Sequence, residues 1–452
     1  MKEMGVIGRW ALILLLLGNV YGGFAQDANT ARAQHIYELF VAGQGDSIHA
    51  ALNRELQEKL APALFNDSFR QAEKMFGKSI SKGEWKTDSA QGITIYYSDV
   101  EFERYNLRFL VAFDADGALN TIRLVPAPAA STAQPVAYDK TKMDERDITL
   151  GADGYKLPGT LTLPKRAVGP DACRVPCVIL VHGSGPHDRD ETIGPNKPFR
   201  DLAWGLAKRG IAVVRYEKRT KAYGAACVPA GRELDYDTEA VDDAVAIVEQ
   251  VRALPELAPD SVYVLGHSLG GTLAPCIAGR SKGLAGIIIL AGLARSLEDA
   301  LEEQFYYTSS LTDSSVNVKV QLDELKQQLA NVKKLGTEEF DETISLPLGQ
   351  PRSYWLFANA YKPVEVAAKL KLPIFVLQGE RDYQVTMEDF GLWRSGLLRC
   401  KNAYFKSYPK LNHLLQEGSG KATPFEYSHA SPVPAYVMDD IASFVRGKQN
   451  TL

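Results

Sequence analysis

The sequence predicts an α/β protein: a mostly parallel sheet with helices on both faces, interrupted by a helical insertion and preceded by a small α+β domain. From about residue 177 onwards, short apolar runs alternate with segments of helical spacing, and these runs lack the period-two alternation of a half-exposed strand. Ahead of them, helical spacing gives way to strand-like runs, and a Pro- and Ala-rich stretch separates the two parts. With 452 residues, the chain is long enough for two or three such units.

The composition is that of an ordinary soluble globular protein, with 45% hydrophobic and 23% charged residues. The formal net charge of -4 is slight for this length, so neither nucleic acid nor an anionic membrane surface is expected as a partner. The five cysteines show no metal-ligand spacing, and we therefore expect no metal site, no bound cofactor and at most one or two disulfides.

Residues 1–25 have the features of a cleaved secretory signal. Lys2 and Arg9 precede or flank a compact apolar run from Ala11 to Leu17, and Gly23 and Ala25 are small residues suited to signal peptidase. The apolar run is short for a membrane span, so we expect an exported protein, periplasmic or secreted, without stable membrane insertion. An uncleaved anchor is the alternative.

Residues 28–126 are expected to form the small α+β domain, with a strong hairpin signal at Asp116-Gly117. Helical spacing is found at residues 31–42, 47–60 and 66–76, and strand-like runs at 93–98, 107–113 and 119–124. This order resembles the small cystatin- or NTF2-like domain of unknown function that often precedes bacterial secreted hydrolases. No acid–base constellation appears in this part of the chain, so a spacer, dimerisation or ligand-docking role is expected rather than a second active site. The dimerisation role would make the protein a homo-oligomer through this domain.

Residues 127–140 form the expected linker, and residues 141–448 the larger α/β domain. The larger domain begins with an antiparallel hairpin, in which residues 147–150 pair with 159–164. Buried strands are expected at residues 177–181, 211–215, 262–265, 284–291, 373–377 and 403–408, and helices at 199–208 and at 238–253, with Thr238 as N-cap.

The alternation of strands and helices stops from about residue 295 to residue 365. Apolar residues at helical spacing from Val318 to Val332 predict a helix, and Gly336 is a natural stop. We expect this insertion to be a cap over the functional site. A helical hairpin that binds a partner is the alternative.

The strand at residues 262–265 runs into Gly266-His267-Ser268-Leu269-Gly270, which is a G-x-S-x-G nucleophile elbow. This motif places a serine on a tight turn between a strand and a helix, so that its hydroxyl projects above the sheet. Glycines on either side remove Cβ atoms that would collide in so sharp a turn. Ser268 is therefore the candidate nucleophile.

A serine nucleophile needs a base and an acid that orients the base, and in this arrangement the chain order is Ser, acid, His. Asp382 lies just after the strand at residues 373–377 and is the candidate acid, with Glu380 and Asp389 as weaker alternatives. Of the two histidines that follow, His413 is the candidate base, while His429 is expected to be an accessory or surface residue.

The negative charge that develops on the substrate oxygen needs two hydrogen-bond donors. One is expected to be the backbone N–H of Leu269, next to the nucleophile. The other should come from the glycine-containing loop after the strand at residues 177–181, and Ser184 N–H is favoured over Gly185 N–H. His182 and His267 are expected to be structural hydrogen-bonding residues.

Four separated motifs resemble those of bacterial α/β-hydrolase carboxylesterases. They are the H-G-S-G-P-H-D-R-D-E loop at 182–191, the G-H-S-L-G-G elbow at 266–271, Leu273-Ala274-Pro275 and Leu411-Asn412-His413. The resemblance implies the α/β-hydrolase fold, a triad of Ser268, Asp382 and His413, and a carboxylic ester as substrate. An ionic network of His187, Asp188, Arg189 and Asp190 is expected to brace this loop.

We therefore expect an exported serine esterase that works through an acyl-enzyme on a small-molecule ester, either a short acyl ester or an acetylated or aromatic ester of a sugar. A peptidase or a thioesterase on the same scaffold is the close alternative, although the sequence shows neither a coenzyme A signature nor an amine-binding carboxylate pair. A non-catalytic binding protein is a further alternative, which the complete triad disfavours.

Overall fold

The computed structural model describes residues 29–90, 93–103, 106–127, 139–152, 154–169, 172–311 and 316–447. The expected signal segment and most of the expected linker lie outside the described residues. The chain divides into two compact units, Met1–Ala130 with Leu311–Asp313, and Ser131–Ser310 with Ser314–Leu452.

The N-terminal unit combines short helices with an antiparallel sheet in the order β1-β3-β4-β5, and β2 pairs with β3. A helix over residues 29–41 comes first. The other elements are α2 (Gly45–Ala51), α3 (Arg54–Lys59), α4 (Ala63–Asn66), α5 (Ser68–Phe76), β1 (Ser79–Lys82), β2 (Lys86–Ala90), β3 (Ile93–Phe102), β4 (Asn106–Phe113) and β5 (Leu119–Pro126).

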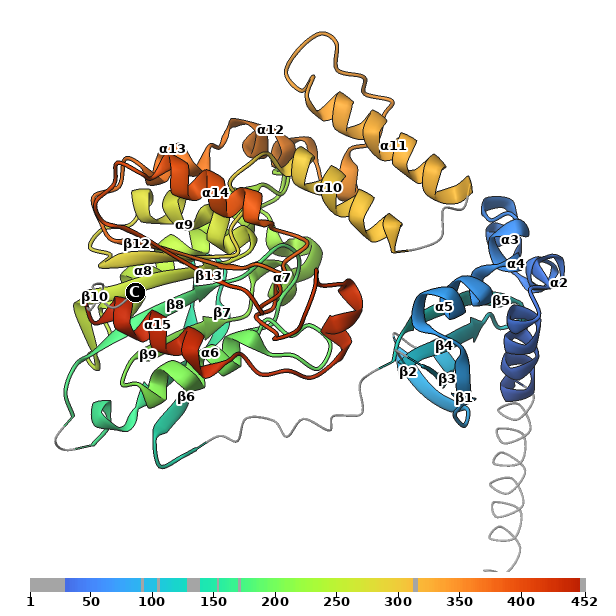
Figure 1. The fold of residues 1–452 in the computed structure, drawn as a ribbon, viewed down its shortest axis with the longest axis horizontal. Coiled ribbons are helices and arrows are strands. Elements are labelled where there is room, and N and C mark those ends of the chain that lie inside the picture. The colour runs from blue at the N-terminus through green and yellow to red at the C-terminus, as the bar shows by residue number, and fades with distance from the viewer. Residues whose placement is uncertain are drawn as a thin grey trace, which may run out of the picture. The chain divides into compact units, whose positions relative to one another are not determined.

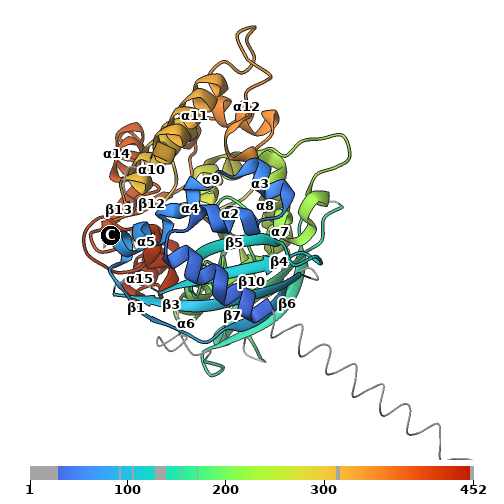
Figure 2. The same cartoon turned by 90° about the vertical axis from the view of Figure 1, so that its right-hand side faces the viewer.

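Aromatic rings hold the first helix of this unit on its sheet, and Figure 2 shows the helix lying across the strands. Tyr37 and Phe40 on the helix each lie 5.2 Å, centroid to centroid, from the ring of Phe109 in β4. Rings of this size contribute much buried apolar area, so this cluster is the core of the unit.

The prediction of a single helix at residues 47–60 is wrong, because this stretch contains two helices, the end of α2 and the whole of α3. Asn53 lies between them, and its side chain accepts a hydrogen bond of 3.0 Å from the Leu56 N–H, which caps α3. The Asn53 N–H donates to the Leu119 carbonyl at the start of β5. This backbone hydrogen bond to the sheet therefore ends the helix that the apolar spacing alone would continue.

The strands β1 and β2 were not predicted from the sequence, because they are polar and lack an alternating apolar pattern.

The larger unit contains an eight-stranded sheet in the order β13-β12-β11-β10-β8-β9-β7-β6. The first hairpin and the β7–β9 pair are antiparallel, and all other pairs are parallel. Its strands are β6 (Met143–Leu150), β7 (Leu157–Pro164), β8 (Val175–Val181), β9 (Ala212–Tyr216), β10 (Leu257–His267), β11 (Gly286–Leu290), β12 (Ile374–Gly379) and β13 (Ala403–Tyr408).

Helices cover both faces of this sheet, as Figure 1 shows. The helices of this unit are α6 (Pro198–Lys208), α7 (Arg219–Tyr223), α8 (Asp242–Arg252), α9 (Leu269–Arg280), α10 (Leu297–Ser310), α11 (Val316–Val332), α12 (Arg352–Ala360), α13 (Pro363–Ala367), α14 (Met387–Gly396) and α15 (Ala435–Val445). Short helical turns lie at Lys165–Ala167, Gly224–Cys227, Asp237–Val241, Pro347–Gly349 and Pro424–Ser428.

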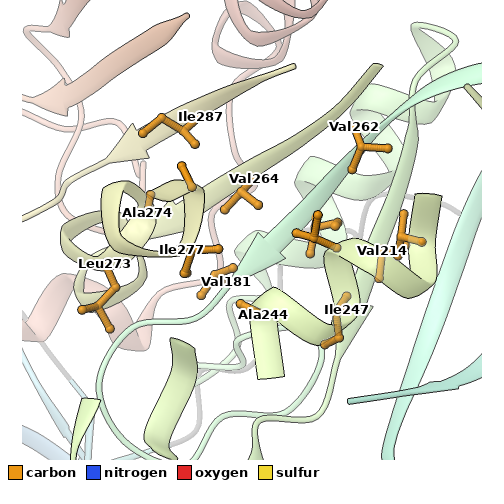
Figure 3. Packing of buried hydrophobic residues seen from close by; sticks show 14 of the residues in the cluster. Val181, Val214, Ala244, Ile247, Val262, Val264, Leu273, Ala274, Ile277 and Ile287 are labelled. Atoms are coloured by element: carbon orange, nitrogen blue, oxygen red, sulfur yellow. The ribbon is translucent and has the colours of Figure 1, made fainter. Parts of the chain in front are cut away.

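The two faces of β8 show how the sheet is buried. Ile179 and Val181 pack into the core under α8 and α9, whereas Val178 and Leu180 pack into the core under α6 and α15. Figure 3 shows the first core, in which Val181 and Val264 of the strands meet side chains from both helices. The predicted α/β architecture, with a mostly parallel sheet covered on both faces, is confirmed.

Three details differ from or add to the expectation. Thr238 is not an N-cap; it lies inside a π-helical turn before α8, and Asp235 and Thr238 exchange hydrogen bonds in which each side chain accepts from the other's N–H. All five cysteines are free thiols. Among the helices that the structure describes, none has the length and apolar character needed to cross a membrane.

Candidate active site

Ser268 occupies a strained turn between β10 and α9. Its φ of 55° and ψ of −119° are unusual for a residue with a side chain, because the Cβ crowds the backbone in this region. The turn is held from both sides, since the Ser268 N–H donates to the Leu290 carbonyl at 2.9 Å and the Ser268 carbonyl accepts from the Thr272 N–H at 2.9 Å. The surrounding hydrogen bonds thus fix the strained conformation.

The glycines of the elbow are required by close backbone approach. A Cβ on Gly266 would lie 2.0 Å from the Gly270 carbonyl oxygen, and a Cβ on Gly270 would lie 2.2 Å from the carbonyl oxygen of Val181 at the end of β8. Any side chain at either position would overlap the backbone. The elbow can therefore form only where both positions lack a Cβ.

Asp382 and His413 are hydrogen-bonded to each other, with Asp382 Oδ2 2.7 Å from His413 Nδ1, and both are buried. Asp382 follows the end of β12, and its other oxygen accepts from the N–H groups of Gln384 and Val385 at 2.8 and 3.1 Å. These bonds fix the carboxylate toward the imidazole. Asp382 and His413 thus share the carboxylate–imidazole hydrogen bond that orients the base in a serine triad.

The weaker candidates are engaged elsewhere. Glu380 accepts a hydrogen bond from Ser407, and Asp389 accepts from the N–H groups of Ala294 and Thr386. Asp389 is thereby part of the capping box of α14. His429 is exposed, as expected for a surface residue, and its Nδ1 lies 3.5 Å from Ser428 Oγ.

The loop after β8 passes directly against the nucleophile. A Cβ on Gly183 would lie only 3.2 Å from the Ser268 Cβ, so the loop can approach this closely because the residue is glycine. The Gly183 N–H donates to Glu191 at 2.7 Å, and the Gly185 N–H donates to Glu239 at 3.2 Å. Ser184 lies between these two anchored positions and lines the cavity next to Ser268.

The expected ionic network around this loop is present for Arg189 and Asp190, whereas Asp188 accepts hydrogen bonds from Thr192 and forms no ion pair in the described structure. Arg189 pairs with Glu217 at 2.9 Å, and Asp190 pairs with Lys197 at 3.0 Å and with Arg215. The neighbouring His182 hydrogen-bonds through Nε2 to the Asp188 carbonyl, and the His187 ring donates to the Ser184 carbonyl. Burial lowers the pKa of His182 to about 3, so this ring is neutral and structural.

Sequence reasoning did not single out Glu191, which joins the loop to the elbow and to the base. One Glu191 oxygen accepts from Gly183, and the other lies 2.8 Å from His267 Nδ1. The opposite nitrogen of His267 donates to the His413 carbonyl at 2.9 Å. Burial alone would raise the pKa of Glu191, but the charge of His267 and its hydrogen bond lower that pKa to about 2.

A cavity of about 280 Å³ opens on the nucleophile. Its lining residues are Ser184, Tyr236, Ser268, Leu269, Thr272, Leu293, Leu297, Ala300, Leu301, Gln304, Leu348, Gln350, Tyr354, Gln384 and Val385. None of these side chains carries a charge. Helices α10 and α12 of the insertion supply part of this lining, so the insertion covers the site as a cap would.

Among the described residues, no group of three or more His, Cys, Asp or Glu side chains is placed to hold a metal ion. The chemistry that this arrangement offers is that of a serine with an Asp–His pair and backbone donors.

The fold and the site together define a serine hydrolase of the α/β-hydrolase class. Residues 176–417 match the family described as serine aminopeptidase, S33, and the chain belongs to this family. Residues 33–121 match a family described as a protein of unknown function, DUF3887.

The chain is 37% identical over 351 residues to Esterase EstD of Thermotoga maritima, an alignment that covers 78% of this chain and 79% of that protein. The predicted class of enzyme, a carboxylic ester hydrolase, is confirmed by this relative together with the family match.

Two solved structures are also similar. Est1E from Butyrivibrio proteoclasticus has 16% identity and a TM-score of 0.42, over 68% of this chain and 99% of that chain. The acylaminoacyl peptidase of Pyrococcus horikoshii has 15% identity and a TM-score of 0.43, over 82% of this chain and 51% of that chain. Membership of the family rests on the family match and on the curated relative alone.

Proposed function

We propose that the protein is an exported serine carboxylesterase that hydrolyses short acyl esters, including acetylated or aromatic esters of sugars, through an acyl-enzyme. The single observation that carries the choice of substrate is the uncharged cavity of about 280 Å³ that opens on Ser268.

The first half of the reaction transfers the acyl group to the enzyme. Ser268 Oγ attacks the ester carbonyl carbon while His413 takes the hydroxyl proton, and Asp382, which holds Nδ1 of the ring, stabilises the imidazolium. The carbonyl electron pair moves onto oxygen. When the tetrahedral intermediate collapses, the C–O bond breaks and His413 gives the proton to the leaving alcohol.

The second half repeats these steps with water. His413 takes a proton from the water as its oxygen attacks the acyl carbon, and the proton then goes to Ser268 Oγ as the acid leaves. In both halves the oxyanion accepts hydrogen bonds from the backbone N–H groups of Leu269 and Ser184. Leu269 is the first residue of α9, so the positive end of the helix dipole lies at the same place.

The size and lining of the cavity favour a small, neutral acyl group. Pockets for drug-sized ligands are roughly 300–1,000 Å³, so this cavity of about 280 Å³ lies just below that range. A peptidase that reads a free amino terminus needs a carboxylate near the nucleophile, and a thioesterase for acyl-coenzyme A needs cations for phosphate. Neither kind of group lines this cavity in the described part of the chain.

The proposal is tested with nitrophenyl esters from acetate to decanoate and, in parallel, with aminoacyl nitroanilides that carry a free amine. We expect the highest kcat/KM for short esters, little anilide cleavage, and no ester turnover by Ser268→Ala above the rate without enzyme. Equal ester rates for wild type and Ser268→Ala, or anilides cleaved in preference to esters, would contradict the proposal. A screen over acetylated glycans, feruloyl esters and simple acyl esters then identifies the natural ester.

Export is proposed from the composition of residues 1–25, and it predicts that the protein recovered outside the cytoplasm begins near Gln26. N-terminal sequencing of that protein checks this.

The N-terminal domain is proposed to serve docking or self-association. Deleting residues 27–135 should therefore leave turnover of small esters unchanged while altering the oligomeric state, and a loss of turnover with the fold intact would contradict this role.

A further inference from the structure

Lys218 is a buried cation that contacts the loop beside the nucleophile. Its side chain is 2% exposed, and its Nζ donates a hydrogen bond of 2.7 Å to the Gly183 carbonyl. The same ammonium group forms an ion pair with Glu239, which is 3% exposed. Burying a charge is costly unless it is paired and hydrogen-bonded, so both contacts are needed to keep Lys218 in the interior.

The carbonyl that Lys218 holds belongs to the same peptide unit as the Ser184 N–H. In a trans peptide the C=O and the N–H point in opposite directions, and no described peptide bond is cis. When Lys218 fixes the Gly183 oxygen, it therefore also fixes the direction of the Ser184 N–H. Because the ammonium group draws electron density toward that oxygen, it makes the N–H a stronger donor.

Glu239 anchors the next peptide unit. Its carboxylate accepts from the Gly185 N–H at 3.2 Å and simultaneously pairs with Lys218. Glu191 takes the Gly183 N–H on the other side. The peptide units before and after the Ser184 N–H are thus held by buried carboxylates, and the unit that contains this N–H is held by Lys218.

We infer that Lys218 is a positioning residue for the oxyanion hole: through the Gly183 carbonyl it orients and polarises the Ser184 N–H, and Glu239 keeps Lys218 in place. The inference rests on the proposed function, because it assigns Ser184 N–H the role of oxyanion donor. Lys218 contacts the loop backbone and is not among the residues that line the cavity on Ser268, so its effect reaches the reaction through that peptide.

The neighbouring ion pair supplies a matched control. Arg219 is the next residue in the chain, and it pairs with Asp243 through two bonds of 2.6 and 2.7 Å, with both side chains as buried as the first pair. In the described part of the chain, the Arg219 side chain donates its hydrogen bonds to Asp243 and none to the 182–185 loop. Arg219→Met therefore breaks a buried ion pair of similar burial without touching the oxyanion peptide.

The test compares wild type, Lys218→Met and Arg219→Met on phenyl acetate and on its thiono analogue, in which sulfur replaces the carbonyl oxygen. A developing thiolate accepts hydrogen bonds weakly, so an oxyanion donor accelerates the oxygen ester far more than the thiono ester. Removing one donor outright costs about 10²–10³ in kcat, and a misdirected donor should cost less. For Lys218→Met we expect kcat for the oxygen ester to fall about 10- to 100-fold at nearly constant KM.

The kcat of Lys218→Met for the thiono ester should fall far less, so the ratio of the oxygen-ester rate to the thiono-ester rate decreases. Arg219→Met should keep the wild-type ratio even if its thermal stability falls as much. Equal losses on both esters, an unchanged kcat in folded Lys218→Met, or the same fall of the ratio in Arg219→Met would each overturn the inference. If Lys218→Met does not fold, Lys218→Met/Glu239→Gln, which leaves no unpaired charge, takes its place in the same comparison.

Different results would contradict the proposed function itself. Wild-type protein that does not hydrolyse phenyl acetate, or Ser268→Ala that hydrolyses it as fast as wild type, would reject the serine esterase itself. Ser268-dependent turnover with an unaltered oxygen-to-thiono ratio in Lys218→Met would reject only the role of Lys218.

Discussion

Glu191 and His267 form a hydrogen-bonded pair in the interior, with Oε2 of the carboxylate 2.8 Å from Nδ1 of the ring and neither side chain more than 4% exposed. The opposite ring nitrogen faces the His413 carbonyl, which can only accept, so that nitrogen carries a hydrogen. Burial alone would lower the pKa of His267, but the charge of Glu191 and its hydrogen bond raise that pKa, which favours the imidazolium form with a hydrogen on Nδ1 as well. The ring centroid of His267 lies 4.8 Å from that of His413.

This pair predicts the effect of Glu191→Gln on stability. The amide keeps the shape of the side chain but leaves the ring charge unpaired, and breaking a buried ion pair in this way costs about 3–5 kcal/mol. Urea unfolding near pH 6 should show this loss in the free energy of unfolding. Glu217→Gln removes a partner of Arg189 whose side chain is 20% exposed, against 1% for Glu191, and should lose clearly less; an equal loss would contradict a special role for the buried pair.

The pH dependence of this loss has a defined window. The pKa of Glu191 falls from 4.5 to about 2 on folding, so its stabilisation is fully present above pH 4.5 and is lost as the pH falls toward 2. The pKa of His267 is raised from 6.5, as Glu191 outweighs the opposing effect of burial, so its stabilisation is lost as the pH rises through the raised value. The difference in unfolding free energy between wild type and Glu191→Gln should be greatest between pH 4.5 and 6.5. A difference independent of pH would be inconsistent with an ionised pair.

Asp382→Asn tests which carboxylate orients the base. The amide removes the charge and no longer fixes the tautomer of His413, so kcat should fall by on the order of 10⁴-fold. Glu380→Gln is the control, because Glu380 bonds to Ser407 and is two residues away in the chain. It should retain wild-type kcat on a nitrophenyl ester. A larger loss in Glu380→Gln than in Asp382→Asn would reverse the assignment of the acid.

Gly266→Ala tests the steric demand of the elbow. Its Cβ would meet the Gly270 carbonyl oxygen at 2.0 Å, and overpacking of this kind costs about 1–3 kcal/mol or more. Thermal unfolding and ester turnover should both decline. Gly279→Ala is the control. Gly279 lies in α9, the helix that follows the elbow, where a Cβ would meet nothing within 4 Å, so stability should stay within about 1 kcal/mol of wild type or rise, because alanine favours helix.

Leu301→Ala tests whether the insertion sets the length of the acyl chain. Leu301 of α10 lines the cavity, and its truncation should make room for longer chains, each additional methylene that becomes buried contributing about 0.8 kcal/mol. The profile of kcat/KM from acetate to decanoate should shift toward longer esters. Leu356→Ala in α12, which removes a 41% exposed side chain outside the lining, should leave the profile unchanged.

The sequence was sufficient for the parts of the site that depend on local chemistry. Gly266, Ser268 and Gly270 follow from the geometry of a strand–turn–helix, and the order of Asp382 and His413 follows from where strands end. The parallel sheet could be predicted because its strands are apolar on both faces. All of these features depend on short stretches of the sequence.

Interactions between distant segments could not be read in the same way. Glu191 stands 76 residues before His267, and Lys218 and Glu239 come from separate segments around the 182–185 loop. Nothing in spacing or periodicity distinguishes these buried charges from surface charges. Asn53 was misread for a related reason, because its contact with Leu119 ends a helix that local spacing would continue.

Trapping the acyl-enzyme tests the central claim, that Ser268 is the nucleophile, most directly. The protein is incubated with a nitrophenyl ester, quenched in acid and digested, and the mass of the peptide that contains Ser268 is measured. We predict one acyl group on Ser268 in wild type and in the slowly turning-over Asp382→Asn, and none in Ser268→Ala. An acyl group on another residue, or full turnover by Ser268→Ala, would contradict the claim.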